Sequence, residues 1–96
     1  MKRYSILQGE MTKCYLCGTI YNLHIHEVFF GTANRKKSIQ YGCCVALCGK
    51  HHNLSNEGVH FNKKLDTALK QEMQIKFEEV YPELNFLKIF GRNYKE

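Results

Sequence analysis

Two pairs of metal-binding residue types constrain this chain more than any other feature. A Cys-x-x-Cys turn, followed directly by Gly18, and a Cys-x-x-His segment stand on either side of residues 18–47. Two such pairs can meet around one tetrahedral zinc ion, which accepts thiolate sulfur and imidazole nitrogen as ligands. The sequence therefore predicts a closed structural zinc site with folded structure between its two halves. The predicted ligands are Cys14, Cys17, Cys48 and His51, and His52 is the alternative to His51.

The size and charge of the chain fit a small domain that meets an anionic partner. A chain of 96 residues buries only a modest fraction of its surface, so a bound metal would help it to fold. Its 14 Lys and Arg against 9 Asp and Glu favour nucleic acid as a partner. No signal peptide or membrane-spanning run is present, so we expect no membrane association and a cytoplasmic protein, in which the thiols stay reduced.

Alternating apolar residues predict two strands in the first half of the chain. The first strand is expected at 20–30 and the second at 39–47, with a polar, basic loop at 31–38 between them. Gly42 is interpreted as a bulge or bend within the second strand. Cys43 and Cys44 lack a paired spacing, and we expect both to be buried apolar side chains.

Helix signals dominate the second half, so the predicted fold class is α+β. A short helix is expected from His51 to Asn56, ended by Gly58. A longer helix is expected at 63–81, with Asn62 as its N-cap and Pro82 after its end. The apolar residues after Pro82 would pack back as a short helix or strand.

Four histidines remain once the zinc ligands are assigned, and two of them are expected to meet. The zinc site would fix the start of the short helix beside the first strand, which could bring His26 near His52. Two such side chains could hold one divalent ion against a phosphate group. Histidine also suits the role of general base, because its ordinary pKa lies near neutrality.

From Cys14 to about His60, the chain resembles the HNH endonucleases, also called the ββα-metal or His-Me finger superfamily. It is most similar to the small zinc-stapled members common in phages and prophages. The resemblance implies a single HNH-like domain over residues 1–96, with a core at about 14–60 and a C-terminal helix at about 63–81. The pieces that carry it are Cys14-Tyr15-Leu16-Cys17, His26-Glu27-Val28-Phe29-Phe30-Gly31, Asn34-Arg35-Lys36-Lys37-Ser38, Tyr41-Gly42, Leu47-Cys48-Gly49-Lys50-His51-His52-Asn53 and Gly58-Val59-His60-Phe61.

The resemblance implies a role for each residue of the first motif. In this family a metal ligand precedes the general base, so His26 would be the ligand and Glu27 stands where the base is expected. An ionised glutamate can accept a proton from water, although less effectively than histidine. In a second register, His26 is the base and either His24 or Glu27 is the ligand.

The remaining roles also follow from the resemblance. Asn34 would fix the loop, and Asn56 could add a further contact one turn after His52. The basic run Arg35-Lys36-Lys37 would hold the phosphate backbone of the nucleic acid. The ligands of the catalytic ion would be His26, His52 and, in an approach to the same ion, His60.

The sequence thus predicts a metal-dependent HNH endonuclease that hydrolyses DNA phosphodiester bonds in phage DNA processing or recombination. It would use a structural Zn²⁺ and one catalytic divalent ion, Mg²⁺, Mn²⁺ or another. Cutting both strands would require a homodimer or a larger phage DNA-processing complex. The first alternative is a catalytically weak or inactive zinc-binding HNH-fold module that binds nucleic acid or a protein partner. A further alternative is an inhibitor or adaptor in phage–host conflict.

Overall fold

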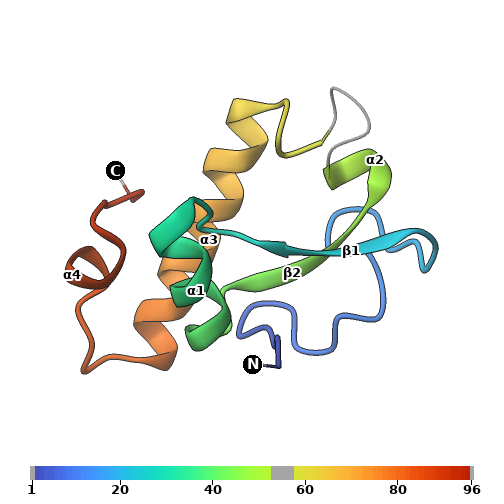
Figure 1. The fold of residues 1–96 in the computed structure, drawn as a ribbon. Coiled ribbons are helices and arrows are strands. Elements are labelled where there is room, and N and C mark those ends of the chain that lie inside the picture. Colours follow the sequence, from blue (N-terminus) through green and yellow to red (C-terminus); the bar gives the residue numbers. More distant parts are fainter. Residues whose placement is uncertain (1, 53–57, 96) are drawn as a thin grey trace.

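The part of the chain that the structure describes is an α+β fold with a two-stranded antiparallel sheet and four helices, which lie mainly at the two ends of the sheet (Figure 1). The computed structural model describes residues 2–52 and 58–95. In chain order the elements are β1 (Leu23–Glu27), α1 (Thr32–Tyr41), β2 (Cys44–Cys48), α2 (Gly49–His52), α3 (Lys63–Val80) and α4 (Phe86–Phe90).

Strand β2 is covered on both edges and buried along its whole length. One edge pairs with β1, in a register that places His26 opposite Val45. The other edge meets the N-terminal segment, where the backbone N–H of Tyr15 donates to Ala46 at 2.8 Å. The N–H of Ala46 also donates to the side-chain oxygen of Gln8 at 2.8 Å, so the N-terminal segment satisfies both backbone polar groups of Ala46.

Helix α1 corrects two sequence predictions, the basic loop at 31–38 and a second strand that begins at 39. Strand β2 begins only at Cys44, and β1 is likewise shorter than the predicted 20–30. Gly42 has a left-handed φ of 74°, and its N–H donates to carbonyls of the last turn of α1. Gly42 therefore ends a helix instead of bending a strand. A side chain at this position would also collide with the ring of Tyr4.

Polar contacts hold α1 in place, since the helix has no apolar stripe. The buried Ser38 hydroxyl donates to the carbonyl of Phe29 at 2.7 Å. Lys37 donates to the carbonyl of Ile89 at 2.6 Å, and the Asn34 amide donates to that of Phe90 at 3.2 Å. These contacts fix α1 to the end of β1 and to α4.

The predicted long helix is confirmed as α3, which ends one residue earlier than expected. The side chain of Asn62 accepts a hydrogen bond from the backbone N–H of Leu65 at 3.1 Å, as predicted for an N-cap. The tail forms the short helix α4, one of the two expected forms. Cys43 and Cys44 are fully buried, as predicted. The core joins apolar residues of both strands to Leu69, Met73, Phe77, Phe86 and Phe90.

Two further predictions concern the short helix and the membrane. Helix α2 begins at Gly49, two residues before the predicted start, and the predicted end of that helix, including Asn56, lies outside the described residues. Within residues 2–52 and 58–95, no helix is long and apolar enough to cross a membrane.

Candidate metal centres

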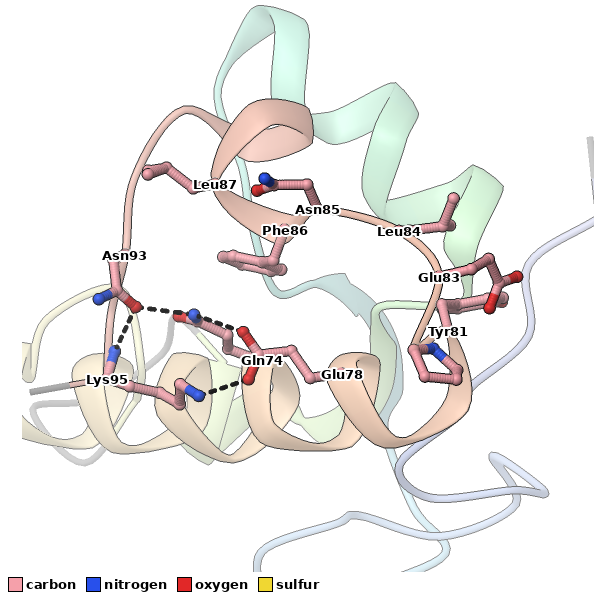
Figure 2. Close-up of a pocket in the computed structure, with 11 residues that line it drawn as sticks. Gln74, Glu78, Tyr81, Glu83, Leu84, Asn85, Phe86, Leu87, Asn93 and Lys95 are labelled. Atoms are coloured by element: carbon pink, nitrogen blue, oxygen red, sulfur yellow. Dashed lines mark hydrogen bonds and ion pairs between the residues drawn. The ribbon is translucent and has the colours of Figure 1, made fainter.

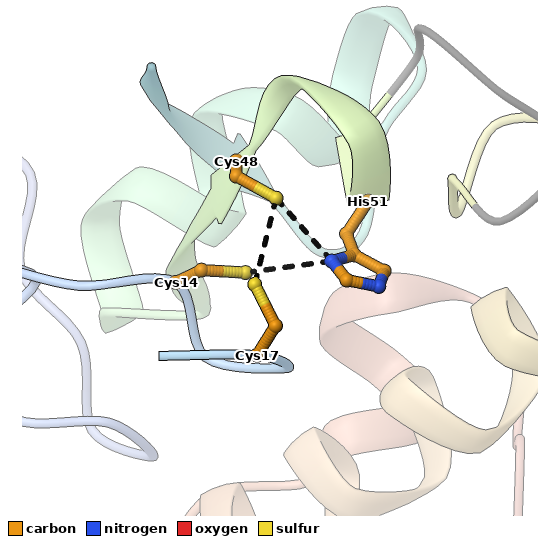
Figure 3. Close-up of side chains that lie close together, drawn as sticks. All are labelled: Cys14, Cys17, Cys48 and His51. Atoms are coloured by element: carbon orange, nitrogen blue, oxygen red, sulfur yellow. Dashed lines mark hydrogen bonds between the residues drawn. The ribbon is translucent and has the colours of Figure 1, made fainter. Parts of the chain in front are cut away.

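The first candidate centre is the Cys/His cluster, which consists of Cys14, Cys17, Cys48 and His51 (Figure 3). Two of its side chains come from the N-terminal turn, one from the end of β2 and one from α2. The Sγ atoms of Cys17 and Cys48 lie 3.7 Å apart. His51 Nδ1 lies 3.3 Å from the Sγ of Cys48 and 3.8 Å from that of Cys14.

These distances fit a metal ion with tetrahedral coordination. With a Zn–S bond of about 2.3 Å and a slightly shorter Zn–N bond, ligand atoms lie about 3.5–3.8 Å from one another. The four side chains could therefore hold a metal ion, and the site is compatible with structural zinc.

Backbone hydrogen bonds make one thiol of this cluster unusually acidic. Burial would raise the pKa of Cys14, but N–H groups of Cys48 and of the Cys-x-x-Cys turn outweigh burial and lower the pKa to about 6. A thiolate is the form that binds metal. Cys44 shows the opposite behaviour, because burial raises its thiol pKa to about 12. The electrostatic environment therefore distinguishes Cys14 of the cluster from Cys44, which only fills the core.

The second candidate centre is the three-histidine cluster, which consists of His26, His52 and His60. One nitrogen of each ring lies within 4.8 Å of the others, and the Nε2 atoms of His52 and His60 are 3.2 Å apart. Backbone hydrogen bonds position the third member, since Val59 donates to the carbonyl of His51 and His60 donates to that of His52.

His26 is the buried member of this cluster. It is only 2% exposed, and its Nε2 has no hydrogen-bond partner among the described residues. A buried nitrogen without a partner costs free energy unless something else binds it. Burial, reinforced by His52 and His60, lowers the pKa of His26 to about 3. The ring is neutral at pH 7 and offers a lone pair to a metal ion.

His24 lies outside the three-histidine cluster and contacts one of its members, His52. The two Nδ1 atoms are 3.0 Å apart, and His24 Nε2 is 3.3 Å from the Oδ1 of Asn22. Asn22 has a φ of 54°, and its carbonyl accepts the N–H of Gly49 at 3.0 Å. The sequence prediction considered His24 only as an alternative ligand and missed this contact. The sequence did contain a signal for this contact: side chains alternate between the two faces of a strand, so His24 lies on the same face of β1 as His26.

Other predicted site residues have partners elsewhere. The carboxylate of Glu27 is ion-paired with Arg3 at 2.8 Å and with Arg35 at 3.2 Å, on a side chain only 13% exposed. Asn34, Arg35, Lys36 and Lys37 lie on α1 instead of a loop. The structure therefore brings together the three histidines but gives Glu27 and Asn34 partners outside their cluster.

A hollow of about 670 Å³ between α3 and the C-terminal tail is separate from both clusters (Figure 2). None of the predicted site residues lines it. Its polar side chains bond to one another: Gln74 donates to Asn93 at 2.7 Å, and Lys95 is ion-paired with Glu78. These contacts attach the tail to α3.

No known protein family, curated protein or solved structure matches this chain. Inference about its function therefore depends on the two clusters and on the surface around them.

Proposed function

We propose that this protein is a metal-dependent endonuclease of the HNH type that hydrolyses DNA phosphodiester bonds. In this proposal β1, β2 and α2 form a ββα-metal unit, and the Cys/His cluster holds a structural zinc ion. The observation that carries the proposal is the convergence of His26, His52 and His60 directly beside that cluster. Phage DNA processing or recombination is the setting that the family resemblance suggests.

Three neutral imidazoles suit an ion that must act on an anion. They leave coordination positions open, and they add no negative charge that would repel a phosphate group. A divalent ion held there would lower the pKa of a bound water and stabilise the leaving oxygen of a phosphodiester. The buried, unpartnered Nε2 of His26 supports this ligand set.

His24 would act as a positioning residue for the ligand His52. A neutral imidazole has one N–H and one acceptor nitrogen, so a His52 that offers Nε2 to an ion must carry its proton on Nδ1. That proton would be donated to Nδ1 of His24, 3.0 Å away, and His24 Nε2–H would then donate to Asn22. Such outer partners fix the tautomer and direction of metal-binding histidines.

Glu27 has no proton-transfer role in this proposal. Its carboxylate would instead connect the N-terminal segment and α1 to the end of β1, through Arg3 and Arg35. Arg35 and Lys36 would still contact the phosphate backbone, since the Arg35 side chain is 61% exposed and Lys36 is exposed. Cutting of both strands would require a homodimer or a larger complex.

The ion pairs of Glu27 also favour a second candidate function. A fold of this type that lacks a free base could bind nucleic acid or a protein partner without cleaving anything. DNA binding without nicking in the presence of any divalent ion would support this second function.

A plasmid-nicking assay with Mg²⁺ or Mn²⁺ tests the proposal. His52→Ala should lower the nicking rate by about 100-fold or more, because it removes a ligand of the catalytic ion. Elemental analysis should find the zinc content unchanged, since His51 and the three cysteines remain. The neighbouring variant His51→Ala is the control, and it should lose zinc and stability together. Full nicking by His52→Ala would contradict the site assignment.

A further inference from the structure

A groove begins at the three-histidine cluster and follows α3. One hollow of about 370 Å³ is lined by Phe30, His60 and Phe61, and a second of about 340 Å³ is lined by Arg92 and Tyr94. Lys63 and Asp66 line both, so the two hollows adjoin. We call the combined feature the α3 groove.

The charge of the α3 groove suits a polyanion. Lys63, Lys70 and Arg92 line it, and its acidic lining residue, Asp66, is ion-paired with Lys70 at 2.9 Å. Among the described residues, neither Lys63 nor Arg92 forms an ion pair with an acidic side chain. Two positive charges are therefore available to phosphate groups.

Exposed aromatic rings line the end of the groove nearest the histidines. Phe61 is 64% exposed and Phe30 is 41% exposed. The ring of Phe30 lies 5.3 Å from that of His60, and the Lys70 ammonium lies 4.2 Å above the Phe30 centroid. Exposed aromatic rings beside basic residues are typical of surfaces on which unpaired bases stack.

We propose that the α3 groove binds a single-stranded segment of the substrate, next to the phosphate that is cleaved. A base would stack on Phe61, and the following phosphates would contact Lys63 and Arg92. This inference rests on the proposed nuclease function and names the form of its substrate. A base in a duplex must first leave its stack before it can reach Phe61, which costs free energy that a single strand does not require.

Fluorescence anisotropy tests the proposal on the zinc-loaded protein without any added Mg²⁺ or Mn²⁺. The probes are a labelled DNA single strand of about 12 nucleotides, a size within the range of known single-strand sites, the matching duplex, and the RNA single strand of the same sequence. The DNA single strand should bind more tightly than the duplex. The RNA arm identifies the sugar that the groove prefers, because base stacking and phosphate contacts are common to both nucleic acids.

Variants locate the binding site. Phe61→Ala should weaken single-strand binding by about tenfold, and Phe61→Tyr, which keeps a ring, should restore it. Lys63→Gln should reduce the salt dependence of binding by about one phosphate contact. The controls are Leu87→Ala and Lys88→Gln, since both residues are exposed on α4 and neither lines the groove.

The outcomes separate the groove from the catalytic proposal. Equal affinity for duplex and single strand, or unchanged binding by Phe61→Ala and Lys63→Gln, would overturn the groove assignment even if nicking depends on His52. Weaker binding by both groove variants supports the assignment even in a protein that shows no nicking.

Discussion

The two candidate metal centres share one short helix but differ in ligand chemistry and in openness. The Cys/His cluster offers four candidate ligand atoms, three of them sulfur, and its distances are compatible with a tetrahedral zinc site. The three-histidine cluster offers only three nitrogen atoms, so an ion held there would keep coordination positions open. Sulfur ligands favour zinc, and a coordination shell filled by protein ligands favours a structural role. Coordination positions left open instead permit a water or substrate to bind the ion. Donor atoms alone thus distinguish the two neighbouring candidate centres of this fold.

The largest expected effect tests the structural role of the Cys/His cluster. Cys48→Ser removes a thiolate from the closed cluster, and a small domain that loses its zinc should lose its cooperative fold. We expect elemental analysis to find little zinc, and far-UV circular dichroism to show no cooperative thermal transition. Cys43→Ala is the matched control, because Cys43 is buried but is not in the cluster. A folded, zinc-free Cys48→Ser protein would contradict the structural role.

A smaller effect tests the open cluster. His24→Ala removes the partner of His52 Nδ1 and should weaken metal binding at the three-histidine cluster by about 10- to 100-fold. Titration with Co²⁺ or Mn²⁺ measures the affinity, while the zinc of the Cys/His cluster should stay bound.

Asn22→Gly is the graded control for this experiment. Glycine tolerates the positive φ of this position, so the change removes only the more distant hydrogen bond and should have a weaker effect. Wild-type affinity in His24→Ala would mean that His24 does not position His52.

The smallest expected effect concerns Glu27, which distinguishes an ion-paired carboxylate from a general base. Glu27→Gln should lower the free energy of unfolding by about 1 kcal/mol, because both arginine partners remain partly exposed to water. The nicking rate should change by less than about tenfold, a far smaller loss than that expected from removal of a catalytic base.

Arg3→Gln provides the matched control for this stability effect. It breaks one of the same ion pairs without touching Glu27, so its loss of stability should be similar or smaller. If Glu27→Gln abolished nicking while its melting temperature matched that of Arg3→Gln, Glu27 would be the general base, as the first of the two registers implied by the family resemblance has it.

Elements with a local signal were predictable from the sequence. Helix α3 has apolar residues at helical spacing, and Asn62 marks its start. Helix α1 has no such stripe. Ser38 and Lys37 stabilise it through the backbone of Phe29 and Ile89, which are partners that no local pattern reveals. Gly42, as a residue that ends helices, was the one available signal.

The two clusters also differ in how much of each could be predicted from the sequence. Pair spacing was enough to place the Cys/His cluster on a few named residues, and that cluster in turn brings His52 near β1. The spacing of residues could not predict the partners of Glu27 and His24. Arg3 is 24 positions from Glu27, and His52 is 28 positions from His24. Contacts at such separations depend on the whole fold.

The adjacency of His51 and His52 in α2 has a consequence for the evolution of this chain. Successive residues in an α-helix diverge by about 100° around its axis, so the helix itself directs His51 and His52 to different clusters. Substitutions in α2 can alter one centre and spare the other. An insertion or deletion of one residue would instead rotate both side chains by about 100° around the helix axis and damage both centres at once. We therefore expect α2 to accept changes of side chain far more readily than any change of length.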